Sequence, residues 1–391
     1  MDITATEFLK FATNTAEHFG FQPGSTFKRT PECKNCSVKL NHTASATDRR
    51  LDALHGLLTS GINAYSEEKL FAFEGPVLYY SVEQVPRSGE AALSLQIFGV
   101  EKSIAEAIII QAARSLMTDL GFINHSVRIN TMGDRDSLTR YARELNNYLK
   151  KRLEDMPETA RELMKEHAFL ALMNLIEKGH ELSYKSPSPL EYLSDSSRKH
   201  FREIVEYLDM SETPYEIDPK LIGHHQCYSD TMFALDILDE EGARLPHEPF
   251  FIRGGRYDNF LERHIGRPVS GVGAVIVLRD KKAPLRTPRR AQNGAPEVYV
   301  VQLGFGPKIK SLLLIDELRR AGILVYQNLA SDSLSAQLRD AEAKAVKFTI
   351  IIGQKEYVEG TVILRDMVGR NQEHVPMNSL ASRLRRVHAV V

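Results

Sequence analysis

The hydrophobic residues in the last quarter of the chain form short blocks with two different periods. VYVVQLG, ILVYQNL, FTIIIG and TVILRDM are apolar runs of strand length, whereas SLLLIDELRRAG and SLSAQLRDAEAKA repeat their apolar positions as helices do. Strands that alternate with amphipathic helices predict a small α/β domain with a mostly parallel sheet, in which TVILRDM is the last strand.

Residues 1–278 follow a mixed pattern that predicts an α+β fold. Helical periodicity indicates helices at 7–19, 104–120 and 140–165, whereas LSLQIFGVE, HSVRIN, DTMFALDIL and VSGVGAVIVL alternate or run apolar like strands of an antiparallel sheet. Prolines and basic residues interrupt every apolar period at 279–295. We therefore expect a catalytic-type domain at 1–278, a linker at 279–295 and the α/β domain at 296–391.

Charge and hydrophobicity exclude several classes of partner. Fifty basic and 51 acidic residues give a formal net charge of -1, so the whole chain has no bias toward nucleic acid, membranes or acidic ligands. A polyanion site must be local, and Arg383, Arg385 and Arg386 form a basic patch suited to RNA phosphates, with solvated surface as the alternative. Without a spanning apolar run or a secretory signal, we expect a soluble cytoplasmic protein with no membrane partner.

The cysteines indicate neither a disulfide framework nor a metal site. Three cysteines cannot pair evenly, which favours a reducing compartment. Cys33 and Cys36 form a single CxxC pair with no second pair nearby. His225 and Cys227 would share one face of a strand, but two ligands do not make a zinc site. We expect no bound metal.

An ordered set of segments resembles histidyl-tRNA synthetases, the class II enzymes that activate histidine with ATP and load it on tRNA. The segments are FGVE, RINTMGDRD, SRKHFREIVEYLDMSETPYEIDP, LIGHHQCYSDTMFALDI and GGRYD, and the part that follows PEVYVVQLG is similar to the family's anticodon-binding domain. The resemblance implies a class II synthetase-like antiparallel sheet with helices, a helical insertion at about 134–200, an anticodon-binding-type α/β domain from 296, and a homodimer.

The residues that the family uses for catalysis are altered in this chain. Gly223 stands where the resemblance places the catalytic arginine, and a glycine has neither the charge nor the donors that stabilise the transition state. Arg87 is the only arginine in the region that would grip the ATP phosphates, and Arg279 does not match the arginine of the third motif. The pocket glutamine, counted back from FGVE, falls on Ile97, and Gln96 is expected on the other face of the strand.

Other pocket residues are retained. Glu101 and Tyr228 align with the glutamate and tyrosine that hydrogen-bond the imidazole of bound histidine, and an imidazole needs one acceptor and one donor. Tyr257, with Gly254 and Gly255, belongs to GGRYD, which is expected to form a loop that closes the same pocket. The alternative is structural: an outward Glu101 at a strand end and a core Tyr228.

Three functions follow from this combination. The leading hypothesis is a histidyl-tRNA synthetase-like protein with degraded catalytic motifs, which binds a histidine-like ligand, tRNA or both, with little or no adenylation. The second is an active histidine-tRNA ligase that uses ATP with Mg²⁺. The third is a non-catalytic RNA-binding or dimerisation protein.

Overall fold

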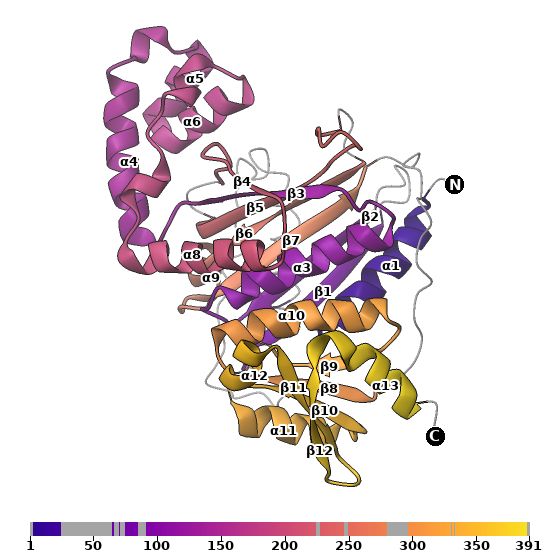
Figure 1. The fold of residues 1–391 in the computed structure, drawn as a ribbon. Helices are drawn as coiled ribbons and strands as arrows, with labels where there is room; N and C mark the ends of the chain where they lie inside the picture. Colours follow the sequence, from indigo (N-terminus) through magenta and orange to yellow (C-terminus); the bar gives the residue numbers. More distant parts are fainter. Residues whose placement is uncertain are drawn as a thin grey trace, which may run out of the picture.

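The computed structural model describes residues 3–24, 65, 70, 75–84, 91–223, 227–245, 249–279, 296–329, 331 and 333–388. Two β-sheets organise this part of the chain, one of seven strands and one of five. Helices α3 and α10 lie between the two sheets, so that the smaller sheet is placed below the larger one in Figure 1.

The seven-stranded sheet is the predicted antiparallel sheet. Its strand order is β1-β2-β7-β6-β5-β3-β4, and all neighbours are antiparallel except the short edge pair β3 and β4. The predicted strands are confirmed as β2, β3, β5 and β7. The strands are β1 (Val77–Gln84), β2 (Ala91–Phe98), β3 (His125–Thr131), β4 (Tyr215–Ile217), β5 (Ser229–Ile237), β6 (Phe250–Arg256) and β7 (Gly271–Leu278).

Each face of this sheet packs against a different set of helices. One face is covered by α1 (Ala5–His18), α3 (Ile104–Asp119) and α8 (Asp195–Met210), whose apolar residues join Leu93, Leu95 and Ile97 of β2 in one core. Phe98 of the same strand belongs instead to the core on the opposite face, with residues of α4, α6 and α9. Alternation along β2 therefore decides which side chains reach which face.

The insertion between β3 and α8 is helical and projects away from the sheet (Figure 1). The single helix expected at 140–165 is wrong, because α4 ends at Lys150 and α5 begins after Pro157. The residue before a proline is driven to an extended conformation, as Met156 is here at φ -86° and ψ 143°. The elements are α4 (Arg135–Lys150), a 3₁₀ turn (Leu153–Asp155), α5 (Glu158–Glu166), α6 (Ala168–Glu177), α7 (Glu181–Tyr184) and a second 3₁₀ turn (Pro189–Tyr192).

The five-stranded sheet has the order β12-β11-β10-β8-β9 and is mixed. Two of its four strand pairs are parallel and two are antiparallel, so the mostly parallel sheet was a wrong expectation. TVILRDM is not the last strand either, because the segment QEHVP forms β12 at the edge of the sheet. This strand is polar because it is largely exposed to solvent and covers no core. The elements are β8 (Val298–Gln302), α10 (Phe305–Arg320), β9 (Val325–Gln327), α11 (Leu334–Ala343), β10 (Phe348–Ile352), α12 (Gln354–Glu359), β11 (Thr361–Asp366), β12 (Gln372–Pro376), a 3₁₀ turn (Met377–Ser379) and α13 (Leu380–His388).

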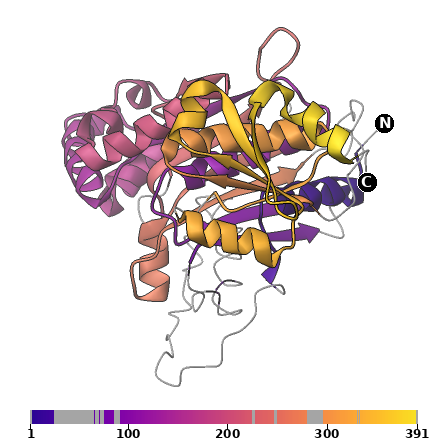
Figure 2. The ribbon, with the colours of Figure 1, turned by 60° about the horizontal axis from the view of Figure 1, so that its bottom comes forward.

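Helix α10 packs against α3 and α1 and so connects the C-terminal part of the chain to the larger sheet. Their apolar residues form one continuous core with both sheets. Across this interface Ser115 Oγ donates to Asp316 at 2.7 Å, and the buried Arg319 forms an ion pair with Asp119. Figure 2 shows the same packing after a rotation. No helix among the described residues is long and apolar enough to cross a membrane.

Candidate functional site

The hydroxyl of Tyr257 and the amide of Gln96 meet on the sheet face opposite α1 and α3. Tyr257 is buried at the start of α9 (Asp258–Ile265), and its hydroxyl donates to Oε1 of Gln96. The amide nitrogen of Gln96 donates to Ser94 Oγ at 2.8 Å. Burial raises the pKa of Tyr257 well above its usual value, so the phenol stays neutral and remains a donor.

This contact corrects the expected orientation of Gln96. Ile97 packs among the helices, and Gln96 faces the same side as Tyr257. The prediction counted the family's spacing back from Glu101, which placed the pocket glutamine at Ile97. Because side chains alternate between the two faces of β2, a difference of one position changes the face.

Tyr228 belongs to the same buried core as Tyr257 and lies directly against Gly223. A Cβ atom built on Gly223 would come within 2.3 Å of Tyr228 Cδ2. Non-bonded carbon atoms do not approach so closely, and the ring therefore occupies the space that a side chain at position 223 would need.

Glu101 is not brought into this buried group. It is exposed, in the turn between β2 and α3, while Tyr228 and Tyr257 have no measurable exposure. Its predicted partnership with Tyr228 across a bound imidazole therefore stays a prediction.

Gly254 and Gly255 lie inside strand β6, so the expected loop is wrong at these positions. A Cβ atom on Gly254 would meet Phe233 Cζ at 2.3 Å, and one on Gly255 would meet the carbonyl oxygen of Thr231 at 2.7 Å and Met232 Sδ at 2.8 Å. Close packing against β5 is sufficient to require both glycines.

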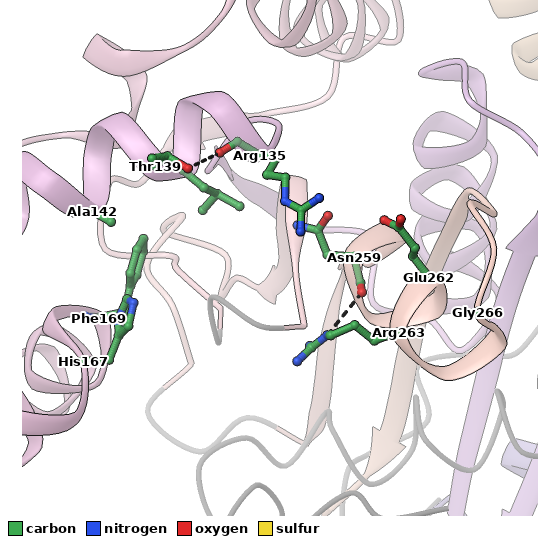
Figure 3. A pocket seen from close by; sticks show the side chains of 10 residues that line it. Arg135, Thr139, Ala142, His167, Phe169, Asn259, Glu262, Arg263 and Gly266 are labelled. Carbon is green, nitrogen blue, oxygen red and sulfur yellow. Dashed lines mark hydrogen bonds between the residues drawn. The ribbon is translucent and has the colours of Figure 1, made fainter. Parts of the chain in front are cut away.

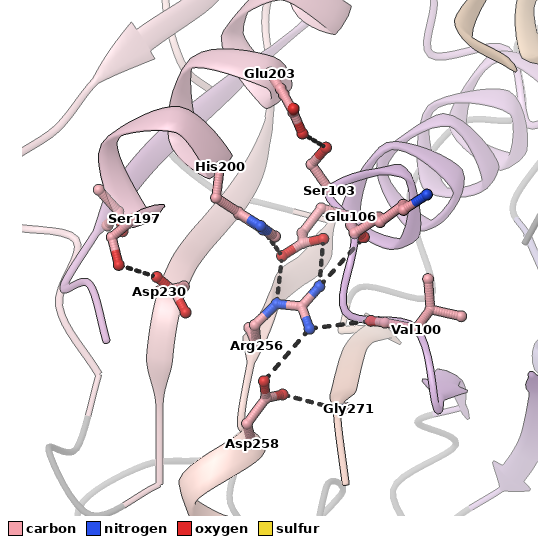
Figure 4. Close-up of polar contacts among 12 residues, drawn as sticks. Val100, Ser103, Glu106, Ser197, His200, Glu203, Asp230, Arg256, Asp258 and Gly271 are labelled. Atoms are coloured by element: carbon pink, nitrogen blue, oxygen red, sulfur yellow. Dashed lines mark hydrogen bonds and ion pairs between the residues drawn. The ribbon is translucent and has the colours of Figure 1, made fainter. Parts of the chain in front are cut away.

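The next residue of GGRYD, Arg256, forms a buried charge cluster that was not predicted. Its guanidinium makes two hydrogen bonds to Glu106, at 2.8 and 2.9 Å, and His200 Nε2 lies 2.8 Å from the same carboxylate (Figure 4). Burial alone would raise the pKa of Glu106, but Arg256 and His200 outweigh it and lower the pKa to about 2. The available signal was Glu106 itself, the only charged residue between positions 104 and 113.

A cleft of about 550 Å³ separates the helical insertion from α9 (Figure 3). Two guanidinium groups and one carboxylate line it, together with the rings of His167 and Phe169, whose centroids are 5.5 Å apart. Burial lowers the pKa of His167, which favours its neutral form at pH 7. The lining residues are Arg135, Leu138, Thr139, Ala142, His167, Phe169, Asn259, Glu262, Arg263 and Gly266.

Comparison with known proteins shows what the chain is similar to. Residues 297–387 match the family described as an anticodon binding domain. The histidine-tRNA ligase of Crocosphaera subtropica is 25% identical over 375 residues, which cover 93% of this chain and 86% of that protein. The histidine-tRNA ligase of Symbiobacterium thermophilum is 26% identical over 384 residues, which cover 96% and 84%. Over most of its length the chain is therefore similar to histidine-tRNA ligases, and its C-terminal part matches an anticodon binding domain.

A solved structure is also similar over most of its length. The apo histidyl-tRNA synthetase of S. aureus matches 95% of this chain and 93% of its own, with 17% sequence identity and a TM-score of 0.49. The antiparallel sheet with helices and the C-terminal anticodon-binding domain expected from the sequence are confirmed by the strand order and by the domain match.

Several other residues considered from the sequence lie elsewhere or outside the described residues. Arg279 stacks over the Phe251 ring, with its guanidinium carbon 4.3 Å from the ring centroid. Arg87, Cys33 and Cys36 lie outside the described residues, as does His225. Cys227 is buried, and no group of three acidic, histidine or cysteine side chains in the described part of the chain could hold a metal ion.

The three arginines predicted to contact RNA lie on α13 of the anticodon-binding domain. All three are exposed, but two already have protein partners. Arg383 forms an ion pair with Glu373 at 2.7 Å, and Arg385 donates two hydrogen bonds to the carbonyl of Ala321 at the end of α10. Arg386 completes the exposed group.

Proposed function

We propose that this member of the histidyl-tRNA synthetase family binds histidine or a similar imidazole and tRNA, with little or no adenylation. One observation carries the proposal: the ring of Tyr228 fills the space beside Gly223, the position that the resemblance gives to the catalytic arginine. Loss of one donor that stabilises developing charge typically lowers the rate about a hundredfold or more.

The small-molecule site is proposed around Gln96, Tyr228 and Tyr257. The Gln96 oxygen accepts from Tyr257 and has a second lone pair, which can accept from the α-amino group of an amino acid. The phenol of Tyr228 is the proposed donor to one imidazole nitrogen, and Glu101, in the turn after β2, is the proposed acceptor for the other. This combination suits a ligand that carries an ammonium and an imidazole.

The tRNA role rests on a second part of the chain. Residues 297–387 match an anticodon binding domain, and the cleft between α4 and α9 presents Arg135 and Arg263 against one acidic side chain. Guanidinium groups bind phosphates in bidentate geometry, so both surfaces suit an RNA backbone. We also propose a cytoplasmic homodimer, which sedimentation should detect at twice the 44.1 kDa chain mass.

An active histidine-tRNA ligase is the alternative that the comparisons favour. The relatives that carry this name match the chain over 74–86% of their own length. Under this alternative the protein uses ATP with Mg²⁺, and Arg87 contributes to the ATP site. A protein that only binds RNA or dimerises is the remaining alternative.

Histidine-dependent ATP-pyrophosphate exchange separates these functions when it is measured together with histidine binding. We expect exchange at least about a hundredfold below that of the Geobacillus histidine-tRNA ligase assayed in parallel, together with detectable histidine binding. Exchange at the level of the Geobacillus enzyme would establish the active ligase instead. Absence of both exchange and histidine binding would leave the RNA-binding alternative.

A further inference from the structure

Arg256 holds the backbone on both sides of Glu101. One of its terminal nitrogens donates to the carbonyl of Val100 at 3.1 Å, and the other donates to the carbonyl of Lys102 at 3.5 Å. The same guanidinium is fixed by its two hydrogen bonds to Glu106 (Figure 4). Glu101 itself is exposed, so the arginine grips the turn from inside while the carboxylate faces outward.

Three consecutive residues connect this turn to the rest of the site. Arg256 reaches the turn before α3, Tyr257 reaches Gln96 on β2, and Asp258 accepts a hydrogen bond at 2.8 Å from the amide of Gly271 on β7. The tripeptide therefore links the turn at residues 100–102 to Tyr257 and to its partner Gln96.

Burial of an arginine at this place is energetically unfavourable unless the guanidinium forms several well-placed hydrogen bonds. Arg256 is 1% exposed, and removing an ion from water costs several kcal/mol before its partners compensate. A lysine could satisfy the charge of Glu106, but its single ammonium cannot reach a carboxylate and two separate carbonyls in one plane. The cluster therefore uses the planar fork of arginine as well as its charge.

We propose that Arg256 is a positioning residue, which fixes the turn that carries Glu101 and so sets the affinity of the site for an imidazole ligand. This inference rests on the proposed function, in which Glu101 accepts a hydrogen bond from the imidazole. Arg256 acts through the backbone of residues 100–102 and does not touch the ligand.

Histidine binding by calorimetry on the full chain tests the proposal. Arg256→Lys should weaken binding by about tenfold, the factor that one net hydrogen bond represents, with unchanged stoichiometry. Arg128→Lys is the matched control, since Arg128 is also a largely buried arginine of the sheet, paired with Asp236 and Asp218. It should lower stability and leave histidine affinity unchanged.

The route through Glu101 is tested by a double-mutant cycle. If Arg256 acts through Glu101, the double variant Arg256→Lys, Glu101→Gln should bind histidine no more weakly than the weaker single variant. The proposal would be overturned if the losses of histidine affinity in the two single variants multiply in the double variant. It would also be overturned if Arg256→Lys binds histidine with unchanged affinity. If Arg256→Lys does not fold, Glu106→Gln removes the anchor of the same guanidinium and should weaken binding in the same direction.

Amide hydrogen exchange distinguishes a failure of the positioning role from a failure of the proposed ligand assignment. Exchange at residues 99–103 should be faster in Arg256→Lys than in Arg128→Lys, whether or not a ligand is present. If the unmodified protein binds no histidine but this exchange rises, the ligand assignment fails and the positioning role stands. Equal exchange in the two variants refutes the positioning role.

Discussion

The ring of Tyr228 packs on the backbone of Gly223 so closely that no Cβ atom fits between them. Any larger residue at position 223 must displace a ring that has no measurable exposure. The glycine at position 223 and the position of this tyrosine are therefore linked in space.

Gly223→Arg should accordingly fail to restore pyrophosphate exchange and should destabilise the protein by about 1–3 kcal/mol, as overpacking of a core does. Urea unfolding measures the second effect. In a Tyr228→Ala background the ring is absent, so Gly223→Arg should cost much less there than in the unmodified chain. Equal costs in both backgrounds would mean that the ring is not the obstacle.

Gln96 and Ile97 offer a direct test of which face of β2 forms the site. Gln96→Leu should weaken histidine binding, because it removes the acceptor proposed for the α-amino group and leaves the Tyr257 hydroxyl without its partner. Ile97→Val should cost about 0.5–1.5 kcal/mol of stability and leave binding unchanged, since Ile97 packs among the helices. The opposite result would restore the face assignment made by counting from Glu101.

The sequence was informative wherever one period persisted over a whole element. The apolar runs of β2, β5 and β7 and the periodic helix α3 were located because a buried face leaves a regular pattern. The polar edge strand β12 and the break at Pro157 leave weaker signals, and both were missed.

The site was predicted less well, because its geometry depends on single residues. The count of positions back from Glu101 gave Ile97 instead of Gln96, and one position along a strand changes the face on which a side chain lies. The pairing of Glu106 with Arg256 joins residues that are 150 positions apart, and no local pattern reports such a contact. The family resemblance singled out GGRYD, but it could not show that Gly254, Gly255 and Arg256 lie in a strand or that Arg256 pairs with Glu106.

Burial of His18 at the α1–α10 interface predicts that the protein loses stability as the pH falls below about 6.5. Burial and the nearby Arg319 lower the pKa of His18 to about 3, so the folded protein binds fewer protons than the unfolded chain between about pH 3 and 6.5. This stability is complete above pH 6.5 and is lost as the pH falls, by at most about 1.4 kcal/mol per pH unit.

Urea unfolding between pH 7.5 and 5 should reveal this slope. His18→Gln should reduce it, and the exposed His374→Gln is the control that should not. His125, whose pKa burial lowers to about 4, leaves a residual slope of the same sign. A slope that is identical in the His18→Gln protein would contradict the assignment.

The C-terminal domain should remain attached after the linker is cut. Trypsin is expected to cleave the basic stretch at 279–295 and to leave fragments near 1–285 and 290–391. Because α10 shares a core with α3 and Arg319 pairs with Asp119, the fragments should still co-elute in gel filtration. Asp119→Ala leaves a buried guanidinium short of one partner and should promote their separation, whereas loss of the surface pair through Lys344→Ala should not.

The last prediction concerns RNA binding by α13 and the cleft. Since the net charge is only -1, affinity for tRNA must come from local arginines and should fall steeply with salt as counterions are released. Neutralising Arg383, Arg385 and Arg386 together should flatten the salt dependence, but Glu373 and the Ala321 carbonyl already engage two of them. The slope of log affinity against log salt should therefore change by the amount expected for the loss of about one or two phosphate contacts. Each contact contributes about 0.7–0.9 to the slope.

The measurement is tRNA binding to the full chain at several salt concentrations, with the variant Arg135→Gln, Arg263→Gln to report on the cleft. If both surfaces contact the RNA, each set of changes should reduce the slope, and their reductions should add because α13 and the cleft share no residue. A change at Tyr228 should leave the slope unaltered, since that ring is buried. If tRNA binds no better than a random single strand, the RNA role is wrong, and a protein that binds only a small imidazole ligand becomes the better account.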